Sequence, residues 1–480
     1  MARDVTITTP QRLRRQLGPW ALTAMGIGCI IGTGIFVLTG IASATRAGPG
    51  LMFSFVIAGC VAALAALCYA EVSSSIPLAG SAYTYTFAAF GEIAAWIIGW
   101  DLILEYSLGA ASVSIGWSGY FSTVLQTAFH VNIPSAFTHA PGDPVSGIVN
   151  APAVVIILIM TALLAKGTRE SSAVNTVIVA IKLLVVLFFI AIGFRHVDFA
   201  NYHLPAGPLT HAGGLLPFGW PGVLSGAAFM FFAYLGFDAV STSAEECKDP
   251  KRDLPFGILM SLAICTVLYI AVVAILNGLV PFYKLNVPNP VAFAVAQAGM
   301  PWGALVISLG AIAGLTTVLL VMMFAQSRVL FAMSRDGLLP SVLSRVHPAW
   351  GTPYVSTIVF GIFIAAFAGF TPLTTIASLS VMGTLAAFML VAIAVPVLRR
   401  RAGVQAAFRV PFGPYAIPVI AAVSALGFMY YLGSFAIVVF GIPLPWLGFV
   451  VWLGMGLVVY FVFARRRAPL DTSGSFDTSG

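Results

Sequence analysis

Long apolar segments recur along almost the whole of this 480-residue sequence, and they restrict the chain to folds that cross a lipid bilayer. Only 8% of the residues are charged and 60% are hydrophobic, whereas a soluble domain carries about 25% charged residues. A membrane-spanning helix needs about 20 apolar residues. Twelve segments approach or exceed that length, at 18–44, 49–75, 92–128, 149–165, 172–194, 219–241, 256–280, 301–330, 353–370, 374–398, 415–440 and 444–463. We therefore predict an all-α integral membrane protein with twelve transmembrane helices.

The positions of lysine and arginine predict the orientation of these helices. If the N-terminus is cytoplasmic, most of the 23 Lys and Arg residues fall in cytoplasmic loops and tails. The exceptions are Arg46, Arg195 and Lys284 outside, and Lys182 within a span. Cytoplasmic loops of membrane proteins carry an excess of these residues, so both termini are expected in the cytoplasm. The net charge of +7 reflects this bias rather than a nucleic-acid-binding face.

Two of the predicted spans carry interruptions near their centres. The first reads GIGCIIGTGIF over 26–36, and the second reads FFAYLGFD over 231–238. Glycine weakens a helix by about 0.5–1 kcal/mol relative to alanine, so these sequences favour local unwinding. Unwound backbone at membrane depth is tolerated only where it lines an enclosed or watery cavity. A pair of such breaks in corresponding positions of two halves is a sequence indication of a transporter's binding site.

The two breaks begin two halves of five predicted spans each. Because five is an odd number, the halves must have opposite orientations, which is a 5+5 inverted repeat. The expected organisation is a cytoplasmic tail over 1–17, a first repeat over 18–195, a second repeat over 219–398, two further spans within 415–463, and a cytoplasmic tail over 464–480.

Five short motifs, in order along the chain, resemble those of the amino acid–polyamine–organocation (APC) superfamily. They lie at 26–36, 80–85, 232–238, 334–340 and 408–412. The stretch through Glu245 and Glu246 to 253–255 is most similar to bacterial members of the cationic amino acid transporter family. The resemblance implies a leucine-transporter-type fold with discontinuous helices 1 and 6. It also implies secondary active transport of L-amino acids across the plasma membrane (the bacterial inner membrane) by alternating access.

The resemblance further implies that the two breaks hold the backbone groups of an amino acid. The N–H groups of Gly32, Thr33 and Gly34 begin a new half-helix, whose positive dipole end suits a carboxylate. Glycines that serve only close helix packing are the alternative interpretation. The expected acceptors for the α-ammonium group are carbonyl groups at Ile30, Phe232, Ala233 and Leu235.

Lys182 is the only cation expected deep within the membrane, roughly 15 Å from the cytoplasmic end of its span. Related proton-coupled members of the superfamily place a fifth-helix lysine where sodium-coupled members hold an ion. Such a lysine would contact carbonyl groups near Gly28 and Cys29. Because burial disfavours a charged lysine, we expect Lys182 to release and regain a proton in each cycle. A static ammonium group that braces the first helix, or one that reaches the interface, is the alternative.

Glu105 lies four residues after Asp101 on one helix face, roughly 20 Å beyond Glu92. Two interpretations stay open for it: a border of the substrate's side-chain pocket, or a contact between helices. Asp238 either gates the pathway or satisfies N–H groups freed by the second break. Phe231 and Tyr234 are expected to close the site by a change of rotamer.

Leu315 faces the side-chain pocket, by analogy with the family's eighth helix. An apolar residue there disfavours a long charged side chain, whereas Glu105 would favour one. We expect small neutral amino acids to be carried by proton-coupled symport. The alternatives are a cationic substrate, an exchanger or an arginine/lysine permease without proton coupling, and Na⁺ coupling through Thr316 and Thr317.

The expected partners are therefore an amino acid, a proton and the lipid bilayer, with a small single-span helical protein as a further candidate and no nucleic acid. The five cysteines form no Cys-x-x-Cys pair and the six histidines all lie in loops. Neither a metal site nor a cofactor is expected. Since an enzyme would need a nucleophile and base or metal ligands at membrane depth, catalytic activity is not expected either.

Overall fold

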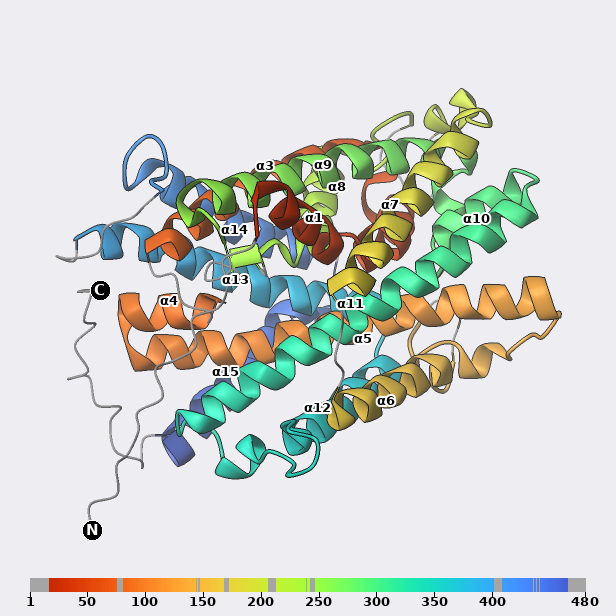
Figure 1. Cartoon of the computed structure of the whole chain (residues 1–480). Helices are drawn as coiled ribbons and strands as arrows, with labels where there is room; N and C mark the ends of the chain where they lie inside the picture. Colours follow the sequence, from red (N-terminus) through yellow and green to blue (C-terminus); the bar gives the residue numbers. More distant parts are fainter. Residues whose placement is uncertain are drawn as a thin grey trace, which may run out of the picture.

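The computed structural model of the chain is almost entirely helical (Figure 1). It describes residues 17–75, 81–143, 145, 147–167, 172–205, 213–238, 240–241, 247–400, 408–434, 436, 438–439 and 441–464. Both predicted tails lie outside these ranges, apart from a residue at each inner end. So do Glu245 and Glu246.

Twelve helices of twelve residues or more account for most of the described ranges. They are α1 (Pro19–Ile30), α3 (Leu51–Ser75), α5 (Glu92–Phe129), α6 (Ala151–Lys166), α7 (Ser172–Phe194), α8 (Gly219–Met230), α9 (Pro250–Leu279), α11 (Pro301–Arg335), α12 (Tyr354–Phe370), α13 (Leu373–Arg400), α14 (Ala416–Ser434) and α15 (Leu444–Val459). Most of their bounds lie within a few residues of the predicted apolar segments.

Shorter elements connect these helices. The α-helical ones are α2 (Thr39–Ala42), α4 (Ser81–Phe90) and α10 (Pro290–Gln297). The π and 3₁₀ turns are η1 (Gly34–Leu38), η2 (Ser43–Ala47), η3 (Gly48–Gly50), η4 (Ser135–Phe137), η5 (Phe199–Tyr202), η6 (Phe231–Tyr234), η8 (Phe282–Lys284), η9 (Ser341–Ser344) and η10 (Tyr460–Ala464). Strands β1 (Val438–Val439) and β2 (Ile442–Pro443) form an antiparallel hairpin in which Val438 lies opposite Pro443.

Among the described residues, eight helical segments are long and apolar enough to cross a membrane, and α1, α6 and α12 are shorter apolar helices. One of the eight runs from Gly34 to Ser75, which is 42 residues. Gly48 interrupts it with a φ of 59°, a backbone conformation that glycine adopts at low cost. Two helices therefore meet at Gly48. The structure is that of a multi-pass membrane protein, as the composition predicts.

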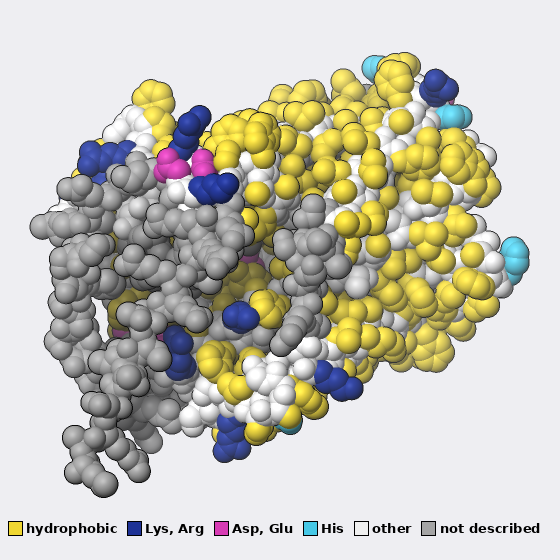
Figure 2. Space-filling model, in the orientation of Figure 1, with side chains coloured by type: hydrophobic (Ala, Val, Ile, Leu, Met, Phe, Trp, Pro, Cys, Tyr) yellow, Lys and Arg dark blue, Asp and Glu magenta, His cyan; other side chains and the backbone are white. Residues whose placement is uncertain are grey.

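The long helices lie side by side along one general direction (Figure 1). Helices α5 and α11 pack against each other through the middle of the bundle, with α6 and α12 paired on one side of them. On the other side, α9 packs against both α1 and α3, and α3 against α8. Apolar side chains cover most of the surface that Figure 2 colours by type, and most of the Lys and Arg side chains visible there gather towards one end.

Local sequence signals explain where several helices begin. Proline stands in the first turn of α1, α6, α10, α11 and α15, where its missing N–H has no helical partner to lose. The Asn150 side chain also accepts a hydrogen bond from the N–H of Ala153, and so caps α6.

Candidate functional site

Both predicted breaks interrupt helical structure. Helix α1 ends at Ile30, Ile31 is extended with a ψ of 103°, and helical structure resumes with η1 at Gly34. Helix α8 ends at Met230 and continues as the 3₁₀ turn η6, after which Leu235 is extended with a ψ of 140°. The carbonyl and N–H groups of these residues are therefore released from regular helical pairing.

The two breaks touch each other. A Cβ atom added to Gly34 would lie 2.4 Å from Ala233 Cα, closer than real Cβ atoms approach. Gly236, with a φ of 101°, lies so near the first break that an added Cβ would be 3.0 Å from the carbonyl oxygen of Cys29. Segments about 200 residues apart in the sequence thus form one continuous region of irregular backbone, and glycine is needed at both contacts.

Tyr269 of α9 joins the two breaks. Its buried hydroxyl group donates to the carbonyl oxygen of Ile30 at 3.0 Å and to that of Ala233 at 2.9 Å. Both carbonyl groups belong to the set predicted to accept the α-ammonium group. Tyr269 is not predicted from the sequence, because a tyrosine within an apolar span looks like a core residue. Of the other predicted acceptors, Phe232 accepts a hydrogen bond from the N–H of Leu235 at 3.2 Å.

The start of the new half-helix carries an unpaired polar group. Thr33 Oγ1 is buried and makes no hydrogen bond in the part of the chain that the structure describes. The N–H of Phe36 donates to the carbonyl of Gly32 at 3.3 Å, which closes the first turn. The N–H groups of 32–34 therefore stand at a helix N-terminus, beside a hydroxyl group that needs a partner.

Apolar side chains of α11 lie next to this half-helix. A Cβ atom added to Gly116 of α5 would meet Thr33 Cγ2 at 3.4 Å and Leu315 Cδ1 at 3.8 Å. One added to Gly32 would meet Val318 at 3.6 Å. Leu315 and Val318 thus both lie beside the first break.

Glu105 does not lie with Leu315. Helices α5 and α11 run antiparallel, with Gly116 opposite Leu315 and the Ser107 side chain bonded to Gln326. Glu105 is therefore about 16 Å further along α5 than the Leu315 level. Its buried carboxyl group lies close enough to the carboxyl groups of Asp238 and Asp101 to interact with their charges. Helix α5 has 38 residues and, at about 57 Å, is longer than the hydrocarbon core. The number of residues between Glu92 and Glu105 therefore does not give the depth of Glu105 in the membrane.

The Lys182 side chain reaches the first break from α7. Its buried ammonium group donates to the carbonyl oxygen of Gly28 at 3.0 Å, the contact that the family resemblance implies. The same side chain lies against α11, where a Cβ atom added to Gly314 would be 2.9 Å from Lys182 Cγ. Lys182 thus fills the space between α1 and α11.

The hydroxyl groups considered for Na⁺ already have hydrogen bonds. Thr316 Oγ1 donates to the carbonyl of Ile312 and accepts from the indole N–H of Trp117, both within 3.0 Å. Thr317 Oγ1 donates to the carbonyl of Gly314 at 2.8 Å.

The three residues predicted to act as gates are buried at the second break and point in different directions. Tyr234 donates its hydroxyl group to the carbonyl of Phe55 in α3 at 2.9 Å, so a change of its rotamer would break this bond. The Phe231 ring packs edge-on against Phe388 of α13. Asp238 lies at the end of the break and accepts, through its carbonyl group, a hydrogen bond from Ser241.

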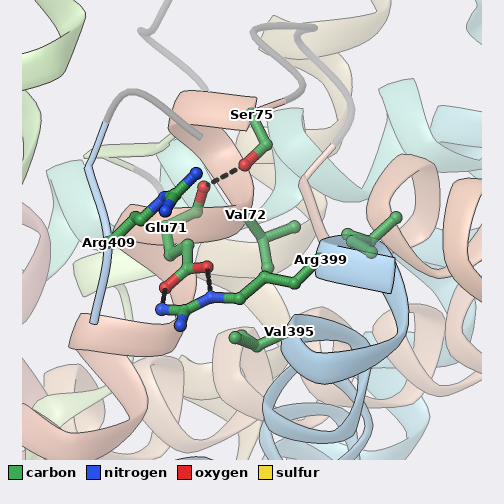
Figure 3. Close-up of a pocket in the computed structure, with 7 residues that line it drawn as sticks. Glu71, Val72, Ser75, Val395, Arg399 and Arg409 are labelled. Carbon is green, nitrogen blue, oxygen red and sulfur yellow. Dashed lines mark hydrogen bonds and ion pairs between the residues drawn. The ribbon is translucent and has the colours of Figure 1, made fainter. Parts of the chain in front are cut away.

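A polar pocket lies apart from the breaks, where α3 and α13 end (Figure 3). Arg399 contacts both carboxylate oxygens of Glu71 through Nε and Nη2, and the N–H of Val410 donates to the same carboxylate at 2.6 Å. Arg409 lines the pocket near this pair. Glu71 therefore ties α3 to α13 and to the segment after it.

Comparison with known proteins identifies the family of the chain. Residues 17–462 match the family model described as "Amino acid permease". The chain belongs to the amino acid permease family. It is similar to a methylthioribose transporter of Bacillus subtilis, with 48% identity over 96% of this chain and 95% of the relative. A branched-chain amino acid permease of the same organism is 47% identical, with the same coverage of both chains. A vacuolar cationic amino acid transporter of Arabidopsis thaliana is 39% identical over 81% of this chain and 64% of the relative.

This amino acid permease is a member of the APC superfamily, as its motifs predict, and a transporter rather than an enzyme. Its paired breaks carry the N–H groups of a helix start on one segment and carbonyl groups released from helical pairing on both.

Proposed function

We propose that this permease is a secondary active transporter that carries L-amino acids across the bacterial plasma membrane by alternating access, in symport with protons. The observation that carries the proposal is the contact of the two breaks with each other, with the Lys182 ammonium group on the Gly28 carbonyl beneath them. The two similar Bacillus proteins support a bacterial plasma membrane location.

The proposed architecture has twelve transmembrane helices, of which the first ten form two inverted repeats of five. Helices α1 and α8 are the first of each repeat, and each ends at a break. Opposite orientations of the repeats bring the two breaks to the same depth from opposite sides. Both termini are then cytoplasmic, as the distribution of Lys and Arg favours.

In this scheme the substrate's carboxylate binds the N–H groups of Gly32, Thr33 and Gly34, at the positive end of the half-helix. The free hydroxyl group of Thr33 supplies a further donor. The α-ammonium group binds carbonyl oxygens of the two breaks: those of Ile30, Phe232, Ala233 and Leu235. Tyr269 holds two of these oxygens in position, because each carbonyl oxygen keeps a second lone pair for the ammonium group.

The side-chain pocket next to Thr33 is apolar, since Leu315 and Val318 border it. We propose neutral amino acids as substrates, and the similarity to a branched-chain amino acid permease supports an aliphatic side chain. Glu105 lies too far from Leu315 to pair with a cationic side chain there. It belongs instead with Asp238, at the inner end of the second break.

Methylthioribose is the second candidate substrate, because a methylthioribose transporter is as similar to this chain as the branched-chain permease is. A thioether sugar has neither an α-carboxylate nor an ammonium group. The helix start and the facing carbonyl groups therefore favour the amino acid.

Proton coupling is proposed to act through Lys182. A charged ammonium group holds the Gly28 carbonyl and with it the end of α1. Loss of the proton removes the charge that strengthens this hydrogen bond and releases α1 for the inward-opening movement. Lys182 also takes the space between α1 and α11 that Na⁺ would need.

Uptake into proteoliposomes tests this mechanism. Labelled L-isoleucine should accumulate in response to an inward proton gradient with no requirement for Na⁺. Lys182→Gln should abolish accumulation but keep exchange of labelled for unlabelled isoleucine across the membrane. Lys284→Gln, which changes an exposed lysine in η8, is the matched control and should behave as the wild type.

Three results would contradict the proposal in different ways. Strict dependence on Na⁺ would identify a sodium symporter. Uptake only into vesicles preloaded with amino acid would identify an exchanger. Thermal stabilisation by methylthioribose but not by L-isoleucine, L-alanine or L-lysine would identify the sugar as the ligand, because only a bound ligand raises the midpoint of unfolding.

A further inference from the structure

Arg46 is a buried arginine on the side of the breaks away from Lys182. It lies in η2, 12 residues after Gly34, and only 6% of its surface is exposed. The helical run from Gly34 leads away from the first break, and η2 packs against α8 there. Gly222 of α8 makes this approach possible, since a Cβ atom added to it would lie 2.4 Å from the carbonyl oxygen of Arg46.

Two contacts of the guanidinium group with described residues are known, and both are on α8. Nη1 donates to Ser225 Oγ at 2.7 Å, and the central carbon lies 4.4 Å from the centre of the Phe229 ring. Helical side chains lean towards the start of their helix. Arg46 therefore leans back towards the first break, and it meets a ring only two residues before Phe231.

No carboxylate neutralises this charge in the part of the chain that the structure describes. The two ion pairs found there are Arg399 with Glu71 and Arg335 with Asp336. A buried arginine is normally paired or hydrogen-bonded throughout, because an unpaired ion loses its hydration at a cost of several kcal/mol. Phe229 offers attraction from its ring face, but it accepts none of the remaining N–H groups.

The Arg46 guanidinium group has more N–H groups than the one that donates to a described residue. A guanidinium group has five N–H donors, and among the described residues Arg46 uses one of them, to Ser225. Ser225 Oγ accepts that bond, and no described residue accepts a hydrogen bond from its O–H. Ser225 is fully buried and Arg46 is 6% exposed, so the pair places N–H and O–H donors side by side with no carboxylate beside them among the described residues.

We propose that Arg46 and Ser225 form a site for a small monovalent anion, a carboxylate or a halide, between η2 and α8. The anion would accept N–H bonds from the guanidinium group and the O–H bond of Ser225, and so neutralise the buried charge. Charge-assisted bonds of this kind are the strongest that arginine makes. Ser225 precedes the second break by six residues, about 9 Å of helix, so this site is separate from the paired breaks and does not depend on the proposed transport function.

Thermal unfolding of the purified full-length protein tests the site with two probes, sodium chloride and sodium acetate. Each is titrated at constant ionic strength, with sodium methanesulfonate as the replacing salt. The wild-type midpoint should rise by a few degrees and saturate, because an anion that binds only the folded state stabilises it. A saturable rise with acetate alone would identify the ligand as a carboxylate, and a saturable rise with chloride alone would identify it as a halide. A saturable rise with both salts would show that the site binds either kind of small monovalent anion.

Variants distinguish this site from a general salt effect. Arg46→Gln should abolish the saturable rise. Arg195→Gln, which changes an exposed arginine on the same side, should leave the rise unchanged. Ser225→Ala keeps the charge and removes one donor, so its half-saturating concentration should increase by about tenfold. The proposal is wrong if neither probe gives a saturable rise in the wild type, or if Arg46→Gln responds as the wild type does.

Discussion

Replacement of Tyr269 by phenylalanine removes a single oxygen atom from the contact between the two breaks. The ring can stay in place, packed against Phe55 and Tyr234. What disappears is the hydroxyl group that lies 3.0 Å from the Ile30 carbonyl oxygen and 2.9 Å from that of Ala233. Without it, the two carbonyl oxygens face each other with no shared donor.

The expected loss has two parts. A hydroxyl group has one hydrogen atom, so the variant loses about 1 kcal/mol of net hydrogen bonding, rising to about 3 kcal/mol because a buried acceptor stays unpaired. If the same oxygens bind the substrate's ammonium group, their displacement also weakens a bond to a charged group. Such a bond is worth about 1.5–3 kcal/mol, which corresponds to an increase of about 10- to 150-fold in Kd.

Tyr234→Phe is the matched control for this experiment. Tyr234 is equally buried at the second break, and its hydroxyl group also contacts two oxygens, the carbonyl of Phe55 and Oγ1 of Thr266. Neither of those is a proposed substrate contact. Both variants should therefore lower the midpoint of thermal unfolding to a similar extent, but only Tyr269→Phe should raise the Kd for L-isoleucine, measured by ligand-induced stabilisation.

The reasoning is refuted if Tyr269→Phe binds L-isoleucine with the wild-type Kd while it loses as much stability as Tyr234→Phe. Tyr269 would then be a purely structural link. An equal increase in Kd for both variants would also refute it, because the effect would then come from general loosening of the break.

Three further predictions concern other parts of the chain. Gly34→Ala should abolish amino acid binding, because its Cβ would overlap the second break, whereas Gly427→Ala in α14, which has open space around it, should bind as the wild type does in the same assay. Glu71→Gln should lower the free energy of unfolding by about 3 kcal/mol by leaving Arg399 without its partner, and a double-mutant cycle with Arg399→Gln should give a favourable coupling energy. Burial raises the pKa of Asp143 in the loop between α5 and α6. Its contribution to stability should therefore fall as pH rises from about 4 through that raised pKa, and Asp143→Asn should remove this part of the stability–pH profile.

The sequence is sufficient to predict the helical framework and the location of both breaks. Apolar length defines the helices, and glycine-rich interruptions within apolar spans have few physical meanings. The contact of Lys182 with Gly28 could also be expected. A lone cation at membrane depth needs an oxygen partner, and the family resemblance indicates which carbonyl groups supply it. These inferences depend on local composition and on depth along one helix.

Other features depend on how distant helices face each other, which composition does not encode. Tyr269 lies 36 residues after Ala233 and looks like any core aromatic residue until its hydroxyl group is placed. For Glu105 two interpretations stayed open, a border of the side-chain pocket or a contact between helices, because position along one helix does not show which neighbours a side chain faces. From the sequence, Arg46 is expected to lie in a loop outside the membrane. Its burial against Phe229 follows from the packing of η2 on α8, which the sequence does not reveal.

The close approach of the two breaks has a consequence for sequence variation among amino acid permeases. Position 34 has no room for a side chain beside Ala233, and position 236 needs a positive φ beside Cys29. A larger residue on one segment can be accepted only if the other segment changes as well. Residue sizes at 34 and 233, and at 29 and 236, should therefore covary across aligned relatives, and the two breaks should be inherited as a single unit although some 200 residues of chain separate them.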